Sequence, residues 1–362
     1  MEMMFQDCIR FATLDAITKD SITKDTKTVN IFINFDWFFQ SYKNKSNNRI
    51  FQCCGPSAAK KFTSNVLNFM GHYRQWGVRR KFNTHVYGYL TTARSSFENA
   101  LYFPDFRKYY VQKSSLSYNE VFYVNSCIEE AIPLISTIAN HVDGVYLIDS
   151  MFTDPSVVPY FINKDIRPAD LNLIVSRDYV DLQYVNIPSF AILYPYHFKT
   201  KDDEDHSRCI DSADKLIAFL QNKETVTHND INSDIASLFL LCTGVCGDKH
   251  RSLPKLPGFG FSSVVSKLES IAKKAGVSCS RETMASAFIE KFNNSSVSLD
   301  ILNTNMKVTS IVAGYNNMSE SVKTSIKSQI IDIPDYENLK MLNLRPEFFV
   351  NYPINLGFLT SN

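Results

Sequence analysis

One stretch of this sequence has residue types and a spacing that suit phosphate chemistry. It begins with Gly247-Asp248 and ends, after Pro254, with Pro257-Gly258-Phe259-Gly260. Two glycines around one apolar residue let the backbone adopt a positive φ, and a phosphate can approach the amides because no Cβ stands in the way. A helix beginning near Ser262 would add its own free N–H groups. The alternative is an ordinary glycine-rich turn between two helices.

Apolar runs that end near an aspartate recur in the first half of the chain. Residues 29–33 lead to Asp36, and residues 173–175 lead to Asp178. Such runs are typical of buried parallel strands, whose carboxyl ends share one edge of a sheet, so the aspartates together favour a site there. Taken singly, each could instead cap a helix or form a turn. The aspartates that follow these runs are Asp36, Asp149, Asp154, Asp178 and Asp181.

The elements that must position these residues alternate along the chain. Strands are predicted near Ile31, Val86, Val145, Ile174 and Ala191, with helical segments between them. This alternation predicts an α/β fold with a mainly parallel central sheet flanked by helices. One such helix is expected from Gly55 to Trp76, because Pro56 opens it and Gly77 follows it.

The order of the motifs along the chain, apolar runs that end near aspartates followed by Gly247-Asp248 and the glycine hairpin, resembles that of the flap endonuclease and bacteriophage 5′ nuclease superfamily. Members of this superfamily have a PIN-like domain. The resemblance runs from about Val29 to about Tyr336. It implies that Asp248 belongs to a metal cluster. It also implies that the glycine hairpin lies in a helix-three-turn-helix and contacts a DNA phosphate. Four units follow from it: an N-terminal extension (1–28), a PIN-like α/β domain (29–200), a helix-three-turn-helix part (201–340) and a C-terminal tail (341–362).

The resemblance also implies which residues contact nucleic acid and metal. The segment from Arg94 to Lys108 is similar to the family's strand, Arg and Tyr-x-x-Tyr-Lys pattern that leads into a helical arch. The implied nucleic-acid contacts are Arg94, Arg107, Lys108, Lys249, Arg251, Lys255, Gly258, Phe259 and Gly260. The implied catalytic and metal residues are Asp36, Asp154, Asp178 and Asp248, with Asp181 as a further ligand.

Departures from the family pattern reduce the expected acidic site. Tyr89, Phe152, Val180 and Arg251 stand where the resemblance implies carboxylates, and Asp181 is displaced by one residue. Two divalent ions about 4 Å apart need enough carboxylates to offset their mutual repulsion, and four are too few. We therefore expect one Mg²⁺ or Mn²⁺ ion, or none. Asp149 can replace Asp154 in this comparison.

Two functions stay open at this point. One is a nucleic-acid-binding 5′ nuclease whose metal-dependent phosphodiester hydrolysis is slow or altered. The other is a catalytically inactive nuclease-fold subunit of a nucleic-acid-processing or viral complex. This alternative stays open because a fold can be retained after its catalytic activity is lost. The expected partner is DNA, as duplex or flap, or RNA. The two terminal segments could also dock a protein partner.

Composition is compatible with either function. The net charge of +1 on 362 residues is not that of a strongly basic nucleic-acid binder, so binding must come from local patches. Eight irregularly spaced cysteines predict a reducing compartment, the cytoplasm, including the host cytoplasm for a viral protein. No apolar run reaches about 18 residues, so a membrane span is not expected.

Overall fold

The computed structural model describes most of the predicted α/β domain and parts of the chain that follows it. The described residues are 9–36, 56–91, 118–139, 142, 144–150, 153–195, 207–220, 235–248, 253–256 and 296–330, with scattered positions between 264 and 290.

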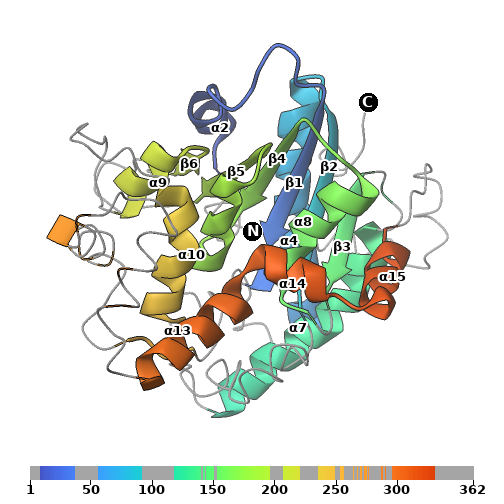
Figure 1. Ribbon diagram of the computed structural model, residues 1–362. Helices are drawn as coiled ribbons and strands as arrows, with labels where there is room; N and C mark the ends of the chain where they lie inside the picture. Colours follow the sequence, from blue (N-terminus) through green and yellow to red (C-terminus); the bar gives the residue numbers. More distant parts are fainter. Residues whose placement is uncertain are drawn as a thin grey trace, which may run out of the picture.

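A six-stranded sheet forms the centre of the molecule, with the strand order β3-β2-β1-β4-β5-β6 (Figure 1). The first five strands pair in parallel, and β6 pairs with β5 in the antiparallel sense. This arrangement confirms the predicted fold class and all five predicted strands. The strands are β1 (Thr28–Asn34), β2 (Asn83–Leu90), β3 (Val145–Asp149), β4 (Leu171–Val175), β5 (Phe190–Tyr194) and β6 (Arg208–Ile210).

Both faces of the sheet are buried, which explains why the strands are apolar at almost every position. Successive side chains of a strand point to opposite faces. In β1, Ile31 and Ile33 join one core, while Phe32 joins the other. Neighbouring parallel strands continue both cores. Helices must therefore cover the sheet on both sides.

One face is covered by α4 (Pro56–Arg79), α7 (Tyr118–Ala139) and α2 (Phe11–Ile17). The predicted end of α4 at Trp76 was wrong, because Gly77 lies inside the helix. A Cβ on Gly77 would lie 2.1 Å from Oγ1 of Thr84, so the glycine lets the helix pack closely against β2.

The other face is covered by short helices from several parts of the chain. Near the strands these are η2 (Pro155–Val157), α8 (Val158–Phe161), η3 (Ile162–Ile166) and η4 (Tyr179–Asn186). Further along the chain they are α9 (Ala213–Leu220), α10 (Ile235–Cys246), α13 (Ser296–Thr309), α14 (Ile311–Asn317) and α15 (Glu320–Ser328).

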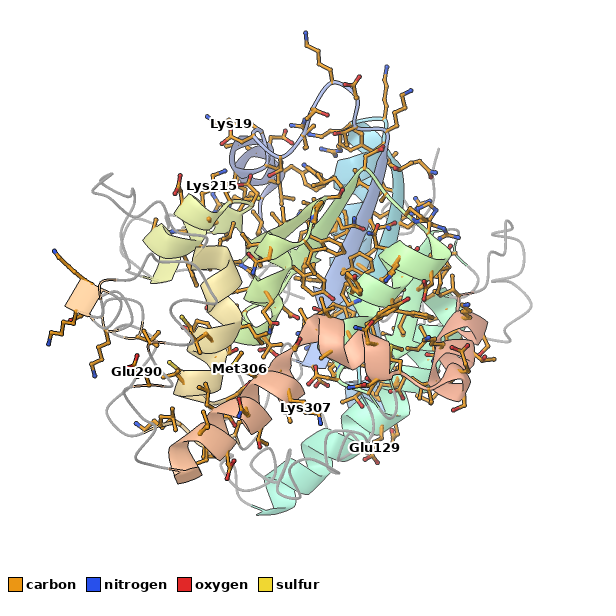
Figure 2. The ribbon with its side chains drawn as sticks, in the orientation of Figure 1. Lys19, Glu129, Lys215, Glu290, Met306 and Lys307 are labelled. Carbon is orange, nitrogen blue, oxygen red and sulfur yellow. The ribbon has the colours of Figure 1, made fainter. Side chains whose placement is uncertain are left out.

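The α10–α13 pair packs closely because α10 carries a glycine at the contact. A Cβ on Gly244 would lie 2.5 Å from Cγ of Met306, a residue of α13 that Figure 2 labels. None of the described helices combines the length and the apolar character that crossing a bilayer requires.

Residues 9–27, here called the N-terminal strap, are fastened to the α4 face of the sheet. Asp15 accepts hydrogen bonds from Trp76 (2.9 Å) and Arg80 (2.7 Å), at the end of the α4 segment. Phe11 stacks on His72 of the same helix with the ring centroids 4.4 Å apart. The strap therefore packs on the α/β domain.

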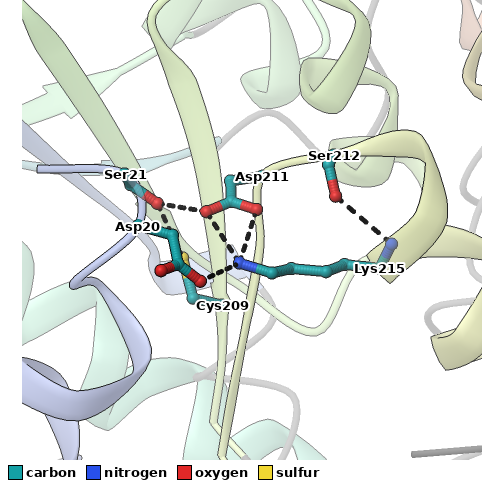
Figure 3. A network of polar contacts seen from close by, with 6 residues as sticks. All are labelled: Asp20, Ser21, Cys209, Asp211, Ser212 and Lys215. Atoms are coloured by element: carbon teal, nitrogen blue, oxygen red, sulfur yellow. Dashed lines mark hydrogen bonds and ion pairs between the residues drawn. The ribbon is translucent and has the colours of Figure 1, made fainter. Parts of the chain in front are cut away.

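The far end of the strap is joined to α9 by a polar network, which Figure 3 shows. Lys215 contacts Asp20 at 3.2 Å and Asp211 at 2.8 Å, and the Ser21 hydroxyl donates to Asp211. The Cys209 thiol lies 3.5 Å from the Ser21 hydroxyl, and burial raises its pKa to about 11. This thiol is therefore protonated at neutral pH and acts as a packing group.

Candidate functional site

Three polar side chains at the carboxyl edge of the sheet converge on one buried carboxylate, that of Asp181. Its Oδ2 atom accepts hydrogen bonds from Nδ2 of Asn34 (2.8 Å), the Tyr89 hydroxyl (2.9 Å) and the Ser176 hydroxyl (2.5 Å). Asn34 ends β1 and is the register partner of Tyr89 in β2, and Ser176 follows β4. Three neighbouring strands therefore supply one donor each. We call these four residues the Asp181 cluster.

Asp181 reaches the sheet edge because a tight turn follows β4. The Asp178 carboxylate caps η4 by accepting from the Val180 amide (3.0 Å), and the Asp178 amide donates to the Ser176 hydroxyl (2.9 Å). These bonds start a 3₁₀-helix immediately after the strand, and the first turn returns Asp181 to the end of β1. The one-residue displacement of Asp181 thus leaves its side chain directed at the sheet edge, with none of its surface exposed.

Burial has a clear effect on the acids and phenols of the Asp181 cluster. Desolvation and the charge of Asp178 raise the pKa of Asp181 to about 6, although the bonds from Ser176 and Asn34 act in the opposite direction. Desolvation and the Asp181 charge also raise the pKa of Tyr89 well above its ordinary value. Tyr89 is therefore a neutral hydrogen-bond donor throughout the physiological pH range.

The other candidate aspartates make local hydrogen bonds at the ends of strands and helices. Asp36 accepts from the Thr91 amide (3.1 Å), which joins the residues that follow β1 and β2. Asp154 is buried and caps η2 by accepting from the Ser156 amide (2.9 Å). Asp154 thus has the capping role that the sequence left open, as Asp178 does for η4, whereas Asp36 bridges the residues that follow two neighbouring strands. Because β1 and β4 are neighbours, Asp36 and Asp178 do follow adjacent strands.

Asp248 lies in a closed turn after α10. Its amide donates to the Leu253 carbonyl (3.1 Å), and the Leu253 amide donates back to the Asp248 carbonyl (2.8 Å). Gly247 has a φ of +61°, and a Cβ there would lie 2.5 Å from the carbonyl oxygens of Leu253 and Pro254. Asn305 of α13 holds the turn by donating to the carbonyls of Gly244 (2.8 Å) and Pro254 (2.7 Å).

Only part of the predicted nucleic-acid contacts can be placed. Lys255 is exposed beside this turn. Val264, Lys267 and Ser270 are helical, in agreement with a helix that begins near Ser262. The remaining predicted contacts lie outside the described residues and stay predictions; they are Arg94, Arg107, Lys108, Lys249, Arg251, Gly258, Phe259 and Gly260.

The described residues do not fit the two-ion site that the resemblance implies. Within the ranges that the structure describes, no three His, Cys, Asp or Glu side chains lie together in a group that could hold a metal ion. The groups that donate hydrogen bonds to the buried Asp181 carboxylate are the neutral side chains of Asn34, Tyr89 and Ser176. The metal roles of Asp36, Asp154, Asp178, Asp181 and Asp248 stay predictions.

Sequence reasoning missed the residues that organise this edge. Asn34, Tyr89 and Ser176 carried no predicted role, and Tyr89 was considered only as a missing acid. One signal was present: Asn34 is a polar residue at the end of an apolar run. Gln183 was missed as well. Its side chain donates to the Thr309 carbonyl (2.7 Å), so it fixes the junction of α13 and α14 against η4.

Solved structures resemble this chain, although no protein-family model and no curated protein matches its sequence. The bacteriophage T5 D15 protein, co-crystallised with metal ions, is 11% identical with a TM-score of 0.50, and 83% of this chain and 97% of the T5 chain are covered. The zinc-bound T5 5′-exonuclease is 12% identical with a TM-score of 0.49, and 85% of this chain and 100% of the exonuclease chain are covered. A T5 D15 flap endonuclease pseudo-enzyme–product complex with DNA and metal ions is 12% identical with a TM-score of 0.49, and 83% of this chain and 97% of the T5 chain are covered. The likeness to the T5 D15 protein shows that this chain has the predicted 5′ nuclease fold.

Proposed function

We propose that this protein binds nucleic acid, either DNA as duplex or flap or RNA, and that its metal-dependent phosphodiester hydrolysis is strongly reduced. The observation that carries the proposal is the Asp181 cluster. At the carboxyl edge of a 5′ nuclease fold, the buried carboxylate is bound by three neutral donors from neighbouring strands.

The reduced hydrolysis follows from what a metal ion would require there. Mg²⁺ and Mn²⁺ need several oxygen ligands with free lone pairs, and anionic ligands offset the charge of the ion. Because Oδ2 of Asp181 already accepts three hydrogen bonds, only Oδ1 of this carboxylate is open to an ion, and Asp154 and Asp178 each cap a helix. An amide, a phenol and a hydroxyl surround the carboxylate where further acids would be needed.

Nucleic-acid binding is supported by a different part of the molecule. Backbone hydrogen bonds between Asp248 and Leu253 close a turn shortly before the glycine hairpin in the sequence, and Lys255, just after this turn, is exposed. The described contacts that close this turn, between Asp248 and Leu253 and from Asn305, involve no residue of the Asp181 cluster. A protein could therefore keep this binding element after losing the acids.

One experiment separates the two parts of the proposal. Purified protein is titrated into fluorescently labelled 5′-flap DNA to measure binding by anisotropy, and the same mixtures are sampled for cleavage in Mg²⁺ and in Mn²⁺. We expect binding with little cleavage. Rapid cleavage in Mg²⁺ that Asp178→Ala abolishes would refute the reduced site. An absence of binding to flap, duplex and single-stranded DNA and to RNA would refute the nucleic-acid assignment.

A second candidate function is a non-catalytic subunit of a nucleic-acid-processing or viral complex. The neutral state of Tyr89 favours it, because a buried phenol cannot supply an anionic ligand at physiological pH. Complete absence of cleavage of every substrate, with binding retained, would select this candidate over a slow nuclease.

A further inference from the structure

Three lysines gather around aromatic rings on helices that pack against the sheet face carrying the Asp181 cluster. The Lys164 ammonium lies 4.4 Å from the centroid of the Tyr315 ring and 5.5 Å from that of Tyr160. The Lys323 ammonium lies 5.5 Å from the Tyr315 ring, and the two tyrosine rings meet edge to face at 5.1 Å. The Lys327 ammonium lies 5.8 Å from the Phe161 ring. We call Tyr160, Lys164, Tyr315, Lys323 and Lys327 the lysine–tyrosine surface.

The ammonium groups of the lysines on this surface lie against aromatic rings. An aromatic ring attracts an ammonium group through its quadrupole without neutralising it. Among the described residues, two acids make hydrogen bonds on this surface. Asp165 accepts hydrogen bonds from the Tyr315 hydroxyl (3.1 and 3.0 Å), and Glu320 accepts from Lys323 (2.9 Å). Three lysines therefore face two carboxylates, both of which already accept hydrogen bonds, so an anionic partner finds ammonium groups to contact.

The lysine–tyrosine surface is continuous with the carboxyl edge of the sheet. Its helices α8, α14 and α15 lie together in Figure 1, and α14 packs against both η2 and α8. Gln329, directly after α15, exchanges two hydrogen bonds with the backbone of Asp149 (2.7 and 3.0 Å), the last residue of β3. A chain that crosses the edge of the sheet near Asp154 would thus reach the lysines next.

We propose that the lysine–tyrosine surface binds a single-stranded segment of nucleic acid that runs from the carboxyl edge of the sheet. The ammonium groups of Lys164, Lys323 and Lys327 would contact phosphates, and the rings of Tyr160 and Tyr315 would stack on bases. Basic and aromatic side chains in alternation suit a single strand, because it offers both charged phosphates and open base faces. This inference rests on the proposed nucleic-acid function and names a surface for it.

The test compares two triple variants of the full chain by fluorescence anisotropy at several salt concentrations. The labelled probes are single-stranded DNA, single-stranded RNA and duplex DNA. The first variant carries Lys164→Gln, Lys323→Gln and Lys327→Gln. The matched control carries the same change at exposed lysines elsewhere, Lys19→Gln, Lys24→Gln and Lys60→Gln. In the first variant we expect the log–log salt slope to fall by about 2, since each contact to a single-strand phosphate contributes about 0.7. The control should bind as the wild type does.

A second pair of variants tests the rings. Tyr315→Leu removes the stacking surface and should weaken single-strand binding roughly tenfold, whereas Tyr315→Phe keeps the ring and should bind as the wild type does. Circular dichroism melts establish that each variant is folded.

The outcomes separate the surface from the proposed function. If the wild type binds and the two triple variants bind equally, the lysine–tyrosine surface is refuted while the proposed function stands. If the first variant loses affinity for duplex but not for single strands, the single-strand occupant is refuted. If the wild type binds no nucleic acid at all, both proposals fail.

Discussion

The hydroxyl of Tyr89 donates a 2.9 Å hydrogen bond to Oδ2 of Asp181, so a phenol on β2 satisfies a carboxylate that η4 buries at the end of β1. Both side chains have almost no exposed surface. A donor lost from such a pair leaves the charged partner less well solvated in a place where water cannot replace it.

Tyr89→Phe tests this relationship directly. We expect the free energy of unfolding to fall by about 1–3 kcal/mol, because the variant keeps the ring but removes one donor from a buried carboxylate. Chemical denaturation measures the change. Tyr146→Phe is a matched control: its hydroxyl shares Arg167 with Tyr87, so Arg167 keeps one tyrosine partner, and the loss should be smaller. Equal losses in the two variants would contradict the special role of Tyr89.

Tyr89→Asp should create a response to metal that the wild type lacks. The introduced carboxylate and that of Asp181 repel each other when both are charged, so the variant should be less stable without a cation. Mn²⁺ should then stabilise it, by about 2.7 kcal/mol at a hundredfold excess over its dissociation constant. Thermal melts with and without Mn²⁺ give the measurement. Tyr89→Asn, which has the same shape without the charge, should show no response. A large Mn²⁺ shift in the wild type would mean that the native residues bind the ion.

Gly247→Ala and Gly276→Ala separate backbone strain from steric contact. Both glycines have positive φ, +61° and +68°, but only Gly247 faces neighbouring backbone, and nothing lies within 4 Å of a Cβ at Gly276. Gly276→Ala should therefore lower the free energy of unfolding by only about 1–2 kcal/mol, the penalty for a side chain in the left-handed conformation. Gly247→Ala must also displace the Leu253 and Pro254 carbonyls and should cost more than about 3 kcal/mol. Denaturant titrations of both variants provide the comparison, and equal costs would show that the turn after α10 opens easily.

Acid should loosen the N-terminal strap through His72. Burial lowers the pKa of His72 below its ordinary value of 6.5, and the charge of Arg79 lowers it further, while Nε2–H donates to the Ile9 carbonyl at 2.8 Å. Because the folded-state pKa is depressed, the unfolded chain takes up the proton more readily. Stability from this group is therefore complete above pH 6.5 and decreases as the pH falls through that value.

Urea unfolding between about pH 5 and pH 8 measures this effect, which amounts to about 1.4 kcal/mol for each unit of pKa shift. His72→Gln removes the titrating group and should flatten the pH dependence of stability. If the free energy of unfolding of the variant depends on pH as steeply as that of the wild type, groups other than His72 cause the dependence.

The sheet could be predicted from the sequence because parallel strands buried on both faces leave a local signature. Ile31 and Ile174 lie in runs that are apolar at nearly every position, and a single window of sequence contains that information. The edge strand β6 has no such signature. Its three residues, with Arg208 half-buried at one end, become a strand only through pairing with β5.

The Asp181 cluster could not be predicted in the same way, because its geometry depends on pairing between distant segments. Tyr89 meets Asp181 only when Tyr89 is in register with Asn34, and when the turn after Ser176 begins as a 3₁₀-helix. A one-residue shift in the strand register would turn Tyr89 away from Asp181, and a one-residue shift in the start of the 3₁₀-helix would turn Asp181 away from Tyr89. The resemblance implied which acids this sequence lacks, but it did not imply which neutral groups bind Asp181.

The N-terminal strap also affects the order in which the protein can fold during translation. Asp15 can bind only after Trp76 and Arg80 have been made, and Asp20 only after Lys215, which leaves the ribosome 195 residues later. Before α4 is made, Ile9 and Leu14 have no core to enter, although both are fully buried in the folded protein. Strand β1 likewise lacks its β4 partner, since Val29 pairs with Leu171. This half of the sheet therefore closes late, and its apolar segments stay exposed during translation until β4 has been made.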